Sequence, residues 1–413
     1  MNCNVNQIHV CYSCKVELER NRKEGCLMKF TLSQYLDELA QLVNIDSVSS
    51  EPVGAGQIAA FFKKRYEELG WYVKSHSFSS TIGPCLEISN KPFDEDAQID
   101  VLLLAHMDTV FPVGTAAQRP FTRQGDRAFG PGIIDCKAGL LSGLYALTEL
   151  HETGALKDAR ICVFLNSDHE GISSKYSHEY SVSIAKRSRY VLVLESARAN
   201  GNLVHKRKGI ARYHLTVKGV GAHAGVDYAK GRSAVEELAH WILALQGATN
   251  LELETTVNVG LIEGGSSINA IPGEAKASVD IRYYDTDEVT RIEKLMDRMA
   301  QNPHVQDTHV IIEGGITRPP MIPSEKTNQL CSVIDTIGHE LKIPFGWTAS
   351  GGGSDGSFSA FAGIPTIDGL GPVGGGAHSV GEYLEIPTVE PRLRLLKNII
   401  VHILHSSAES AVS

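Results

Sequence analysis

The chain has 413 residues, more than one hydrophobic core usually supports, so its length favours two domains. Its content of 42% hydrophobic and 21% charged residues is typical of a globular protein, and a formal charge of -9 argues against a nucleic-acid-binding surface. No apolar run approaches the roughly 20 residues of a transmembrane helix, so we expect no membrane association.

The first 27 residues differ from the rest of the chain. They lack the apolar core of a secretory signal, which favours a cytoplasmic protein. The spacing of Cys11 and Cys14 leaves a small zinc knuckle or a redox pair open, although their possible partners fit no zinc pattern well. We therefore interpret residues 1–27, which also contain Cys3 and Cys26, as a leader outside the fold. The other four cysteines are scattered singly and are expected to be reduced thiols: Cys85, Cys136, Cys162 and Cys331.

Hydrophobic periodicity predicts two amphipathic helices, over 32–43 and 58–69, followed by strands. Two of the strands are short, at 71–73 and 86–89. The next apolar runs are bounded by polar residues, as in strands of an α/β sheet that is covered on both faces. These buried strands are predicted at 101–105, 161–165 and 190–194.

Each buried strand ends in side chains that bind metal ions. Open α/β sheets form their functional sites at the carboxyl ends of parallel strands, so these side chains are expected to lie close together. In chain order they are His106 and Asp108, then His169 and Glu170, then Glu195.

A glycine-rich turn at 130–132 carries Asp135 into a helix whose apolar face includes Leu140, Leu144 and Leu147. Glycines allow the backbone of such a turn to pass close to another group. Taken alone, this segment is typical of an ordinary tight turn.

The pattern changes near residue 205, where half-exposed strands begin. Tyr213, Leu215 and Val217 alternate with polar residues, as in an antiparallel strand with one solvated face. We predict an inserted α+β domain of the ferredoxin-like β-α-β-β-α-β type over 206–316, and a first domain made of 28–205 and 317–413. Its segments are strand 213–217, helix 235–245, strands 255–262 and 275–283, helix 289–299 and strand 309–312.

The first domain is expected to resume with a helix at 329–341 and a short strand at 365–367. Glycine-rich loops at 350–355 and 374–379 flank that strand, and the second loop contains His378. A last helix is predicted to run to about residue 402.

Two imidazoles and three carboxylates together have the donor chemistry that two Zn²⁺ ions with a bridging carboxylate require. Each residue alone is typical of a solvated loop acid or a structural histidine, but five at strand ends and glycine turns favour a metal centre. Two ions ~3.5–4 Å apart activate water and polarise a carbonyl. Occupancy by Co²⁺ or Mn²⁺ stays open. The set is His106, Asp135, Glu170, Glu195 and His378.

These stretches resemble the M20 family of zinc metallopeptidases, which includes glutamate carboxypeptidase, aminoacylase, succinyl-diaminopimelate desuccinylase and acetylornithine deacetylase. The resemblance runs in the family's order from about residue 30 to the end. It is carried by 105–109, 130–139, 166–170, 194–195, 221–225, 267–272, 280–282, 353–355 and 376–379.

The resemblance implies a zinc-peptidase-like catalytic domain with a mixed, largely parallel sheet, an inserted dimerisation domain, and a homodimer. His106, Asp135 and Glu195 would hold one zinc ion, while Asp135, Glu170 and His378 would hold the second. Asp108 would orient His106. His223 would reach across the dimer to stabilise an oxyanion, and the substrate, with its free carboxylate, would be bound by Arg282, Asn269, Gly353 and Ser354.

One position departs from the family pattern of Asp-Glu-Glu, because His169 stands where the first Glu is the general base. Imidazole has a suitable pKa for proton transfer, but its reach differs from that of Glu. We therefore expect a dinuclear zinc hydrolase that cleaves the amide of an N-acyl amino acid or short peptide. Two alternatives stay open: the scaffold carries out acyl transfer or cyclisation, or it is a silent protein that binds metal and carboxylates.

Overall fold

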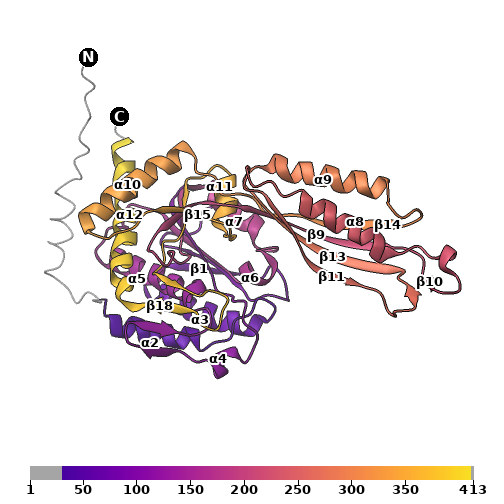
Figure 1. The fold of residues 1–413 in the computed structure, drawn as a ribbon. Helices are drawn as coiled ribbons and strands as arrows, with labels where there is room; N and C mark the ends of the chain where they lie inside the picture. The colour runs from indigo at the N-terminus through magenta and orange to yellow at the C-terminus, as the bar shows by residue number, and fades with distance from the viewer. Residues whose placement is uncertain (1–29, 411–413) are drawn as a thin grey trace, which may run out of the picture.

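The computed structural model describes residues 30–410, which form a broad α/β part and a narrow arm (Figure 1). The predicted leader, with its four cysteines, lies outside the described residues. Within the described residues no helix is long and apolar enough to cross a membrane.

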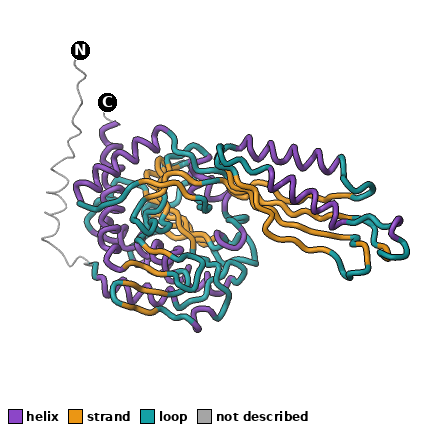
Figure 2. Tube along the Cα trace, viewed as in Figure 1, coloured by secondary structure: helices purple, strands orange, loops and turns teal. Residues whose placement is uncertain are grey.

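A six-stranded mixed sheet forms the centre of the α/β part (Figure 2). Its strand order is β1-β2-β6-β3-β7-β16. The last four strands are parallel, and β2 pairs antiparallel with both the edge strand β1 and β6, which agrees with the predicted mixed, largely parallel sheet. The strands are β1 (Tyr72–His76), β2 (Cys85–Ser89), β3 (Ile99–His106), β6 (Ile161–Asn166), β7 (Ser188–Val193) and β16 (Thr366–Ile367).

Both faces of this sheet are covered, which explains why its middle strands have continuous apolar sequences. Leu103 of β3 lies in the larger core, whereas its neighbours Leu102 and Leu104 lie in the smaller core on the opposite face. Burial of apolar surface on both faces is the main stabilising contribution to this part of the fold. The helices packed against the sheet are α2 (Leu32–Val43), α3 (Pro52–Glu68), α5 (Ala138–Glu152), α10 (Glu325–Leu341) and α12 (Val389–Ser410) on one face, and α7 (His178–Lys186) on the other.

Several short elements were not predicted, because two to six residues are too few to establish a period. They include a four-stranded antiparallel sheet next to the α/β core and the parallel pair β8 and β15. The small sheet has the order β17-β18-β5-β4. The elements are α4 (Thr115–Gln118), β4 (Thr122–Gln124), β5 (Arg127–Phe129), α6 (His169–Ile172), β8 (Leu203–Arg207), β15 (Trp347–Ser350), α11 (Gly356–Phe361), β17 (Gly374–Gly375) and β18 (Tyr383–Glu385).

The arm has the predicted β-α-β-β-α-β order, with an antiparallel sheet in the order β11-β13-β9-β14. Two helices cover one face of the sheet (Figure 1), where Trp241 and Ile292 belong to its buried core. A two-stranded ribbon of β10 and β12 lies at the end of the arm that is remote from the large sheet. The elements are β9 (Gly209–Lys218), β10 (Ala222–His223), α8 (Ala234–Gly247), β11 (Thr256–Gly264), β12 (Ala270–Ile271), β13 (Glu274–Tyr283), α9 (Thr286–Gln301) and β14 (His309–Arg318).

Candidate metal centre

The carboxyl ends of three adjacent parallel strands bring together donors that are distant in the sequence. His106 is the last residue of β3, Glu195 follows β7, and Glu170 lies in the short helix α6 that follows β6. His106 Nε2 lies 3.4 Å from Glu195 Oε1 and 4.0 Å from Glu170 Oε1. The predicted convergence at this edge of the sheet is therefore present.

Asp135 lies between two imidazoles. Its Oδ1 is 3.0 Å from His106 Nε2, and its Oδ2 is 3.1 Å from His378 Nε2. His378 Nε2 also lies 3.1 Å from Glu170 Oε1. One carboxylate thus presents one oxygen to each of two donor groups, as a bridging ligand must.

Buried groups hold the loop that carries Asp135 in place. The Glu382 carboxylate accepts hydrogen bonds from the backbone N–H groups of Gly132, Ile134 and Asp135 at 3.0, 2.9 and 3.2 Å. Burial raises the pKa of Glu382 to about 7, against the opposing effect of these hydrogen bonds. The ammonium of Lys137 donates to the carbonyl of Ile45 at 2.8 Å. Gly132 has a φ of 71°, and a Cβ there would lie 2.4 Å from Thr109 Cγ2, so the turn requires glycine.

The donor set fits a pair of divalent cations. Metal bonds of ~2.0–2.2 Å at a tetrahedral angle separate neighbouring N and O ligands by about 3.3 Å. The distances from His106 Nε2, 3.0 Å to Asp135 Oδ1 and 3.4 Å to Glu195 Oε1, agree with that spacing. Burial opposes ionisation of Asp135, but hydrogen bonds from His106 and His378 hold its pKa well below the usual range, so this carboxylate is anionic. The three carboxylates that converge here, Asp135, Glu170 and Glu195, repel one another unless positive charge lies nearby.

Asp108 interacts with His106 differently from the expected arrangement. His106 Nδ1 is 2.9 Å from the Asp108 carbonyl oxygen but 3.5 Å from its carboxylate. The carboxylate instead accepts hydrogen bonds from the N–H groups of His169 and Glu170 and from the Ser49 hydroxyl, at 3.2, 2.8 and 2.5 Å. The backbone carbonyl therefore orients the imidazole, and the carboxylate fixes the turn that carries Glu170.

His169 is buried beside the donor set. Its ring stacks on that of His106 with centroids 4.2 Å apart, and its Nε2 lies 3.8 Å from Glu195 Oε1. Its Nδ1 is 3.0 Å from Asp355 Oδ2. Burial disfavours the imidazolium, yet the pKa of His169 is raised, and the charge and hydrogen bond of the Asp355 carboxylate contribute to that rise. The position that is a Glu in the family pattern thus holds a carboxylate-paired imidazole that faces the donor set.

Sequence reasoning did not assign roles to the residues that hold His169. Asp355 accepts hydrogen bonds from Arg318, Asn166 and Ser174, each at 2.5 Å, and Arg318 also donates to the His169 carbonyl at 3.0 Å. Asp355 ends the glycine-rich loop at 350–355, and residues 353–355 also carry the family resemblance, so the sequence offers a signal at this position. Arg318, at the end of β14, had no comparable signal.

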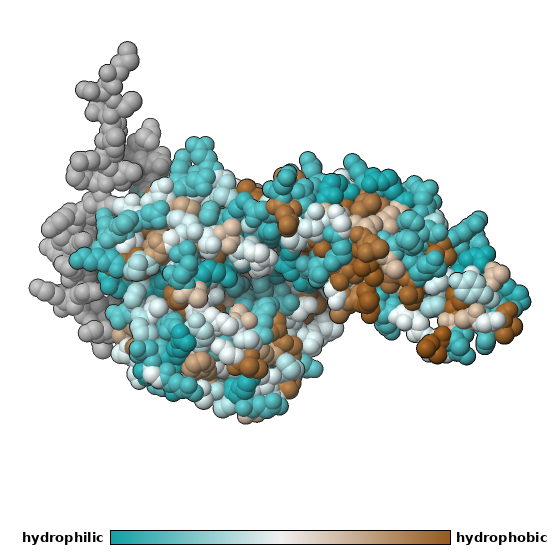
Figure 3. Space-filling view, viewed as in Figure 1, coloured by the Kyte–Doolittle hydropathy of each residue, from teal (hydrophilic) through white to brown (hydrophobic). Residues whose placement is uncertain are grey.

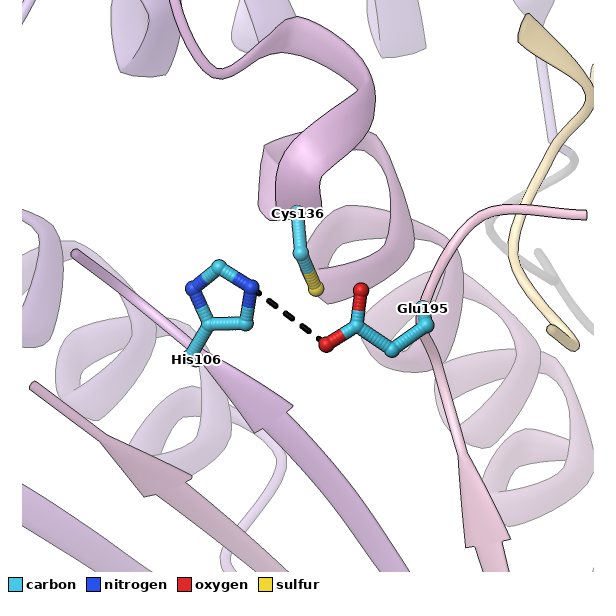
Figure 4. Close-up of side chains that lie close together, drawn as sticks. All are labelled: His106, Cys136 and Glu195. Atoms are coloured by element: carbon cyan, nitrogen blue, oxygen red, sulfur yellow. Dashed lines mark ion pairs between the residues drawn. The ribbon is translucent and has the colours of Figure 1, made fainter. Parts of the chain in front are cut away.

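Cys136 is a second residue next to the donor set to which the sequence assigned no role there. Donor atoms of His106, Cys136 and Glu195 all lie within 4.8 Å of one another, and all three residues are buried (Figure 4). The thiol comes from the segment that precedes α5, the imidazole from the end of β3, and the carboxylate from the segment after β7 (Figure 4).

The residues predicted on the arm do not all approach this centre. His223 is exposed in the terminal ribbon, and Asn269 lies next to that ribbon, where its side chain accepts a hydrogen bond from Ser267. Arg282 is at the opposite end of β13, eight residues from Glu274, or about 26 Å at 3.3 Å per residue. Within one chain, therefore, Arg282 and the pair His223 and Asn269 lie at opposite ends of the arm.

Arg282 and the predicted loop residues lie where the arm joins the α/β part. Arg282 pairs through two nitrogens with Asp280, at 2.6 and 3.1 Å, and donates to the Gly351 carbonyl at 3.0 Å. The Gly353 carbonyl accepts from Arg207 at 3.2 Å. Ser354 is fully buried, and its hydroxyl accepts from the N–H of Gly356 at 3.1 Å, so its side chain is committed to the loop.

Comparisons with known proteins identify relatives that match most of the chain. Residues 205–308 match the model of the peptidase dimerisation domain. Carboxypeptidase G2 of Pseudomonas sp. (strain RS-16) is 30% identical over 369 residues, which cover 88% of this chain and 88% of that protein. The uncharacterized protein YqjE of Bacillus subtilis is 24% identical over 343 residues, covering 81% of this chain and 88% of its own.

Solved structures show the same fold. The aminopeptidase PepT of Bacillus cereus superposes with a TM-score of 0.70 at 22% identity, over 91% of this chain and 99% of its own. The M20 family metallo-carboxypeptidase Sso-CP2 of Sulfolobus solfataricus gives a TM-score of 0.70 at 17% identity, over 89% of this chain and 99% of its own.

Proposed function

Because this chain belongs to the M20 family of metallopeptidases, we propose that it is a dinuclear zinc hydrolase that cleaves an amide bond next to a free carboxylate. The family is one of hydrolases that use a divalent metal. The number of ions, their identity as zinc, and the substrate class are parts of this proposal.

One observation carries the proposal: the two oxygens of Asp135 face two separate imidazoles at 3.0 and 3.1 Å. Glu195 on the His106 side and Glu170 on the His378 side complete two groups of donors around that carboxylate. When bound, the ions would lower the pKa of coordinated water and polarise the scissile carbonyl.

His169 is proposed to move the proton that hydrolysis requires. Its Nδ1 faces Asp355, so its Nε2 is the atom that faces the metal ligands. A general base must lie within reach of the proton it abstracts, and a carboxylate on the other ring nitrogen fixes its orientation. The hydrogen bonds of Asp355 with Arg318, Asn166 and Ser174 in turn hold that carboxylate rigidly.

The proposed enzyme is a homodimer in which the arm completes the partner's site. His223 Nδ1 accepts hydrogen bonds from the N–H groups of Gly225 and Val226 at 3.1 and 3.2 Å, which leaves Nε2–H as an exposed donor. Such a donor suits an oxyanion, yet it lies at the far end of its own arm. The edge strand β11 exposes Leu261 and Ile262, and Figure 3 shows hydrophobic residues gathered on the arm. An apolar edge of this kind favours pairing with a second copy.

The substrate's carboxylate is proposed to bind near Arg282, with Asn269 supplied by the partner. The contact of Arg282 with the Gly351 carbonyl places its guanidinium beside the glycine-rich loop of the α/β part. We also propose that the enzyme works in the cytoplasm, which agrees with four buried free thiols, at Cys85, Cys136, Cys162 and Cys331.

Substitution of His169 tests the proposal. Zinc-loaded protein is assayed against N-acyl amino acids and dipeptides, and bound metal is counted by elemental analysis. His169→Ala should lower turnover by about 10²–10⁴-fold while both ions are retained, because Glu170 rather than His169 is the ligand. His76→Ala, which removes an imidazole paired with Glu87 on the edge strand β1, is the matched control and should leave turnover unchanged.

His169→Glu separates the alternatives. If His169 diverts the scaffold to acyl transfer or cyclisation, the Glu variant should gain hydrolysis that the wild type lacks. A wild type and a Glu variant that both hold two ions and cleave nothing across the panel would refute the hydrolase and favour a silent protein that binds metal and carboxylates.

A further inference from the structure

We propose that Cys136 is a fourth protein ligand of the metal position formed by His106, Asp135 and Glu195, which makes that position selective for thiophilic cations. This inference rests on the proposed function, since it concerns one of the two ion positions. Zn²⁺, Co²⁺ and Cd²⁺ accept thiolate ligands, whereas Mn²⁺ and Mg²⁺ prefer oxygen.

The geometry around the thiol carries the inference. The donor atoms of His106 and Glu195 are 3.4 Å apart, which already matches two ligands of one ion. The Cys136 sulfur lies within 4.8 Å of both donors (Figure 4). With a metal–sulfur bond of about 2.3 Å, a tetrahedral site needs a sulfur–donor separation of about 3.6 Å, so the thiol has to approach each donor by at most about 1.2 Å.

The backbone brings the thiol to this place. A Cβ on Gly139 would lie 1.9 Å from the Leu194 carbonyl oxygen and 3.4 Å from the Cys136 sulfur. Glycine at this position therefore allows the beginning of α5 to press against the chain at the end of β7. The thiol, fully buried in that contact, donates a long hydrogen bond of 3.7 Å to the Leu194 carbonyl, a weak interaction that a metal bond can replace.

The ligand counts of the two positions then differ. His106, Glu195, Cys136 and the shared Asp135 give one position four protein ligands, the number typical of closed sites. Glu170, His378 and Asp135 give the other position three, the number that leaves room for a water or a substrate oxygen. On formation of the sulfur–metal bond, the thiol gives its proton to the solvent.

Cobalt spectroscopy of the full-length protein tests the inference without an activity assay. A thiolate bound to Co²⁺ produces an intense charge-transfer absorption in the near ultraviolet, which histidine and carboxylate ligands do not. The wild type loaded with Co²⁺ should show this absorption, and Cys136→Ala and Cys136→Ser should lose it while they still bind Co²⁺. In competition experiments, Cys136→Ser should lower the preference for Cd²⁺ over Mn²⁺ by about tenfold or more.

Two controls test whether another cysteine gives rise to the absorption. Cys162→Ala removes another buried thiol, and the double variant Cys11→Ala/Cys14→Ala removes the CxxC pair; both should retain the absorption. Thermal unfolding of each metal-free variant shows whether the substitution has damaged the fold. If Cys136→Ala does not fold, the spectrum of the more conservative Cys136→Ser variant tests the inference.

The outcomes distinguish this inference from the proposed function. A wild type that binds two Co²⁺ ions without the absorption, or a folded Cys136 variant that retains it, overturns the inference alone. A wild type that takes up no cobalt overturns the dinuclear centre and the inference together.

Discussion

Replacement of Glu382 should release the loop that carries Asp135, and the size of the effect follows from three hydrogen bonds. Its Oε1 accepts from the N–H groups of Ile134 and Asp135, and its Oε2 accepts from that of Gly132. Glu382→Ala removes all three acceptors. Glu382→Gln retains one oxygen, which can keep the bonds of Ile134 and Asp135, and it lacks the acceptor for Gly132.

Both variants also remove the cost of burying an ionisable carboxyl group, whose pKa burial raises to about 7. Their difference therefore isolates the two retained acceptors. An unsatisfied buried N–H costs about 1–3 kcal/mol, so opening of the loop should be about 2–6 kcal/mol easier in the Ala variant than in the Gln variant. At 1.4 kcal/mol per factor of ten, this is an increase of at least about 30-fold in the opening equilibrium.

Hydrogen exchange of the metal-free protein measures this opening locally. The amides of residues 132–135 should exchange at least about 30-fold faster in Glu382→Ala than in Glu382→Gln, whereas those of β6 should exchange alike. Zinc affinity should fall about 10–100-fold in the Ala variant, since a displaced loop misplaces the bridging ligand. Equal exchange at 132–135 in the two variants would refute the role assigned to Glu382.

Three further predictions concern the proposed reaction. Asp135→Ala should lose most of both ions, and elemental analysis that finds two ions in this variant would exclude a bridging role. His223→Ala and His169→Ala should each be inactive, but a mixture of the two should regain about a quarter of wild-type activity through heterodimers with one intact site; a mixture that stays inactive would mean that His223 does not act across the dimer. Arg282→Lys should raise KM for substrates with a free carboxylate but not for their amides, because an ammonium cannot form the bidentate pair. Equal changes for both substrates would reject this assignment.

Much of the fold could be predicted from the sequence, because apolar runs and the period of apolar residues are local signals. The continuous apolar sequences of β3, β6 and β7 require a sheet covered on both faces, and the alternation in β9 and β13 requires a sheet with one solvated face. Most predicted strand limits agree with the observed ones to within a few residues, although β14 extends six residues beyond its predicted end at 312. The domain boundaries near 205 and 317 stay a prediction. The short strands β4, β5, β17 and β18 were not predicted, since their formation as a sheet depends on pairing with strands that are distant in the sequence.

The sequence by itself also determined the five candidate ligands, because parallel strands must end at one edge and because glycine turns expose the backbone there. The tertiary structure decided everything that depends on contact between segments. Only packing shows that Asp355, which is 186 residues further along the chain, accepts from His169, and that Asp108 supports Glu170 more than His106. Only packing places Cys136 beside Glu195, or His223 far from its own centre. A linear pattern records which groups are available, whereas the distances between them follow from how the layers pack and where glycine permits close approach.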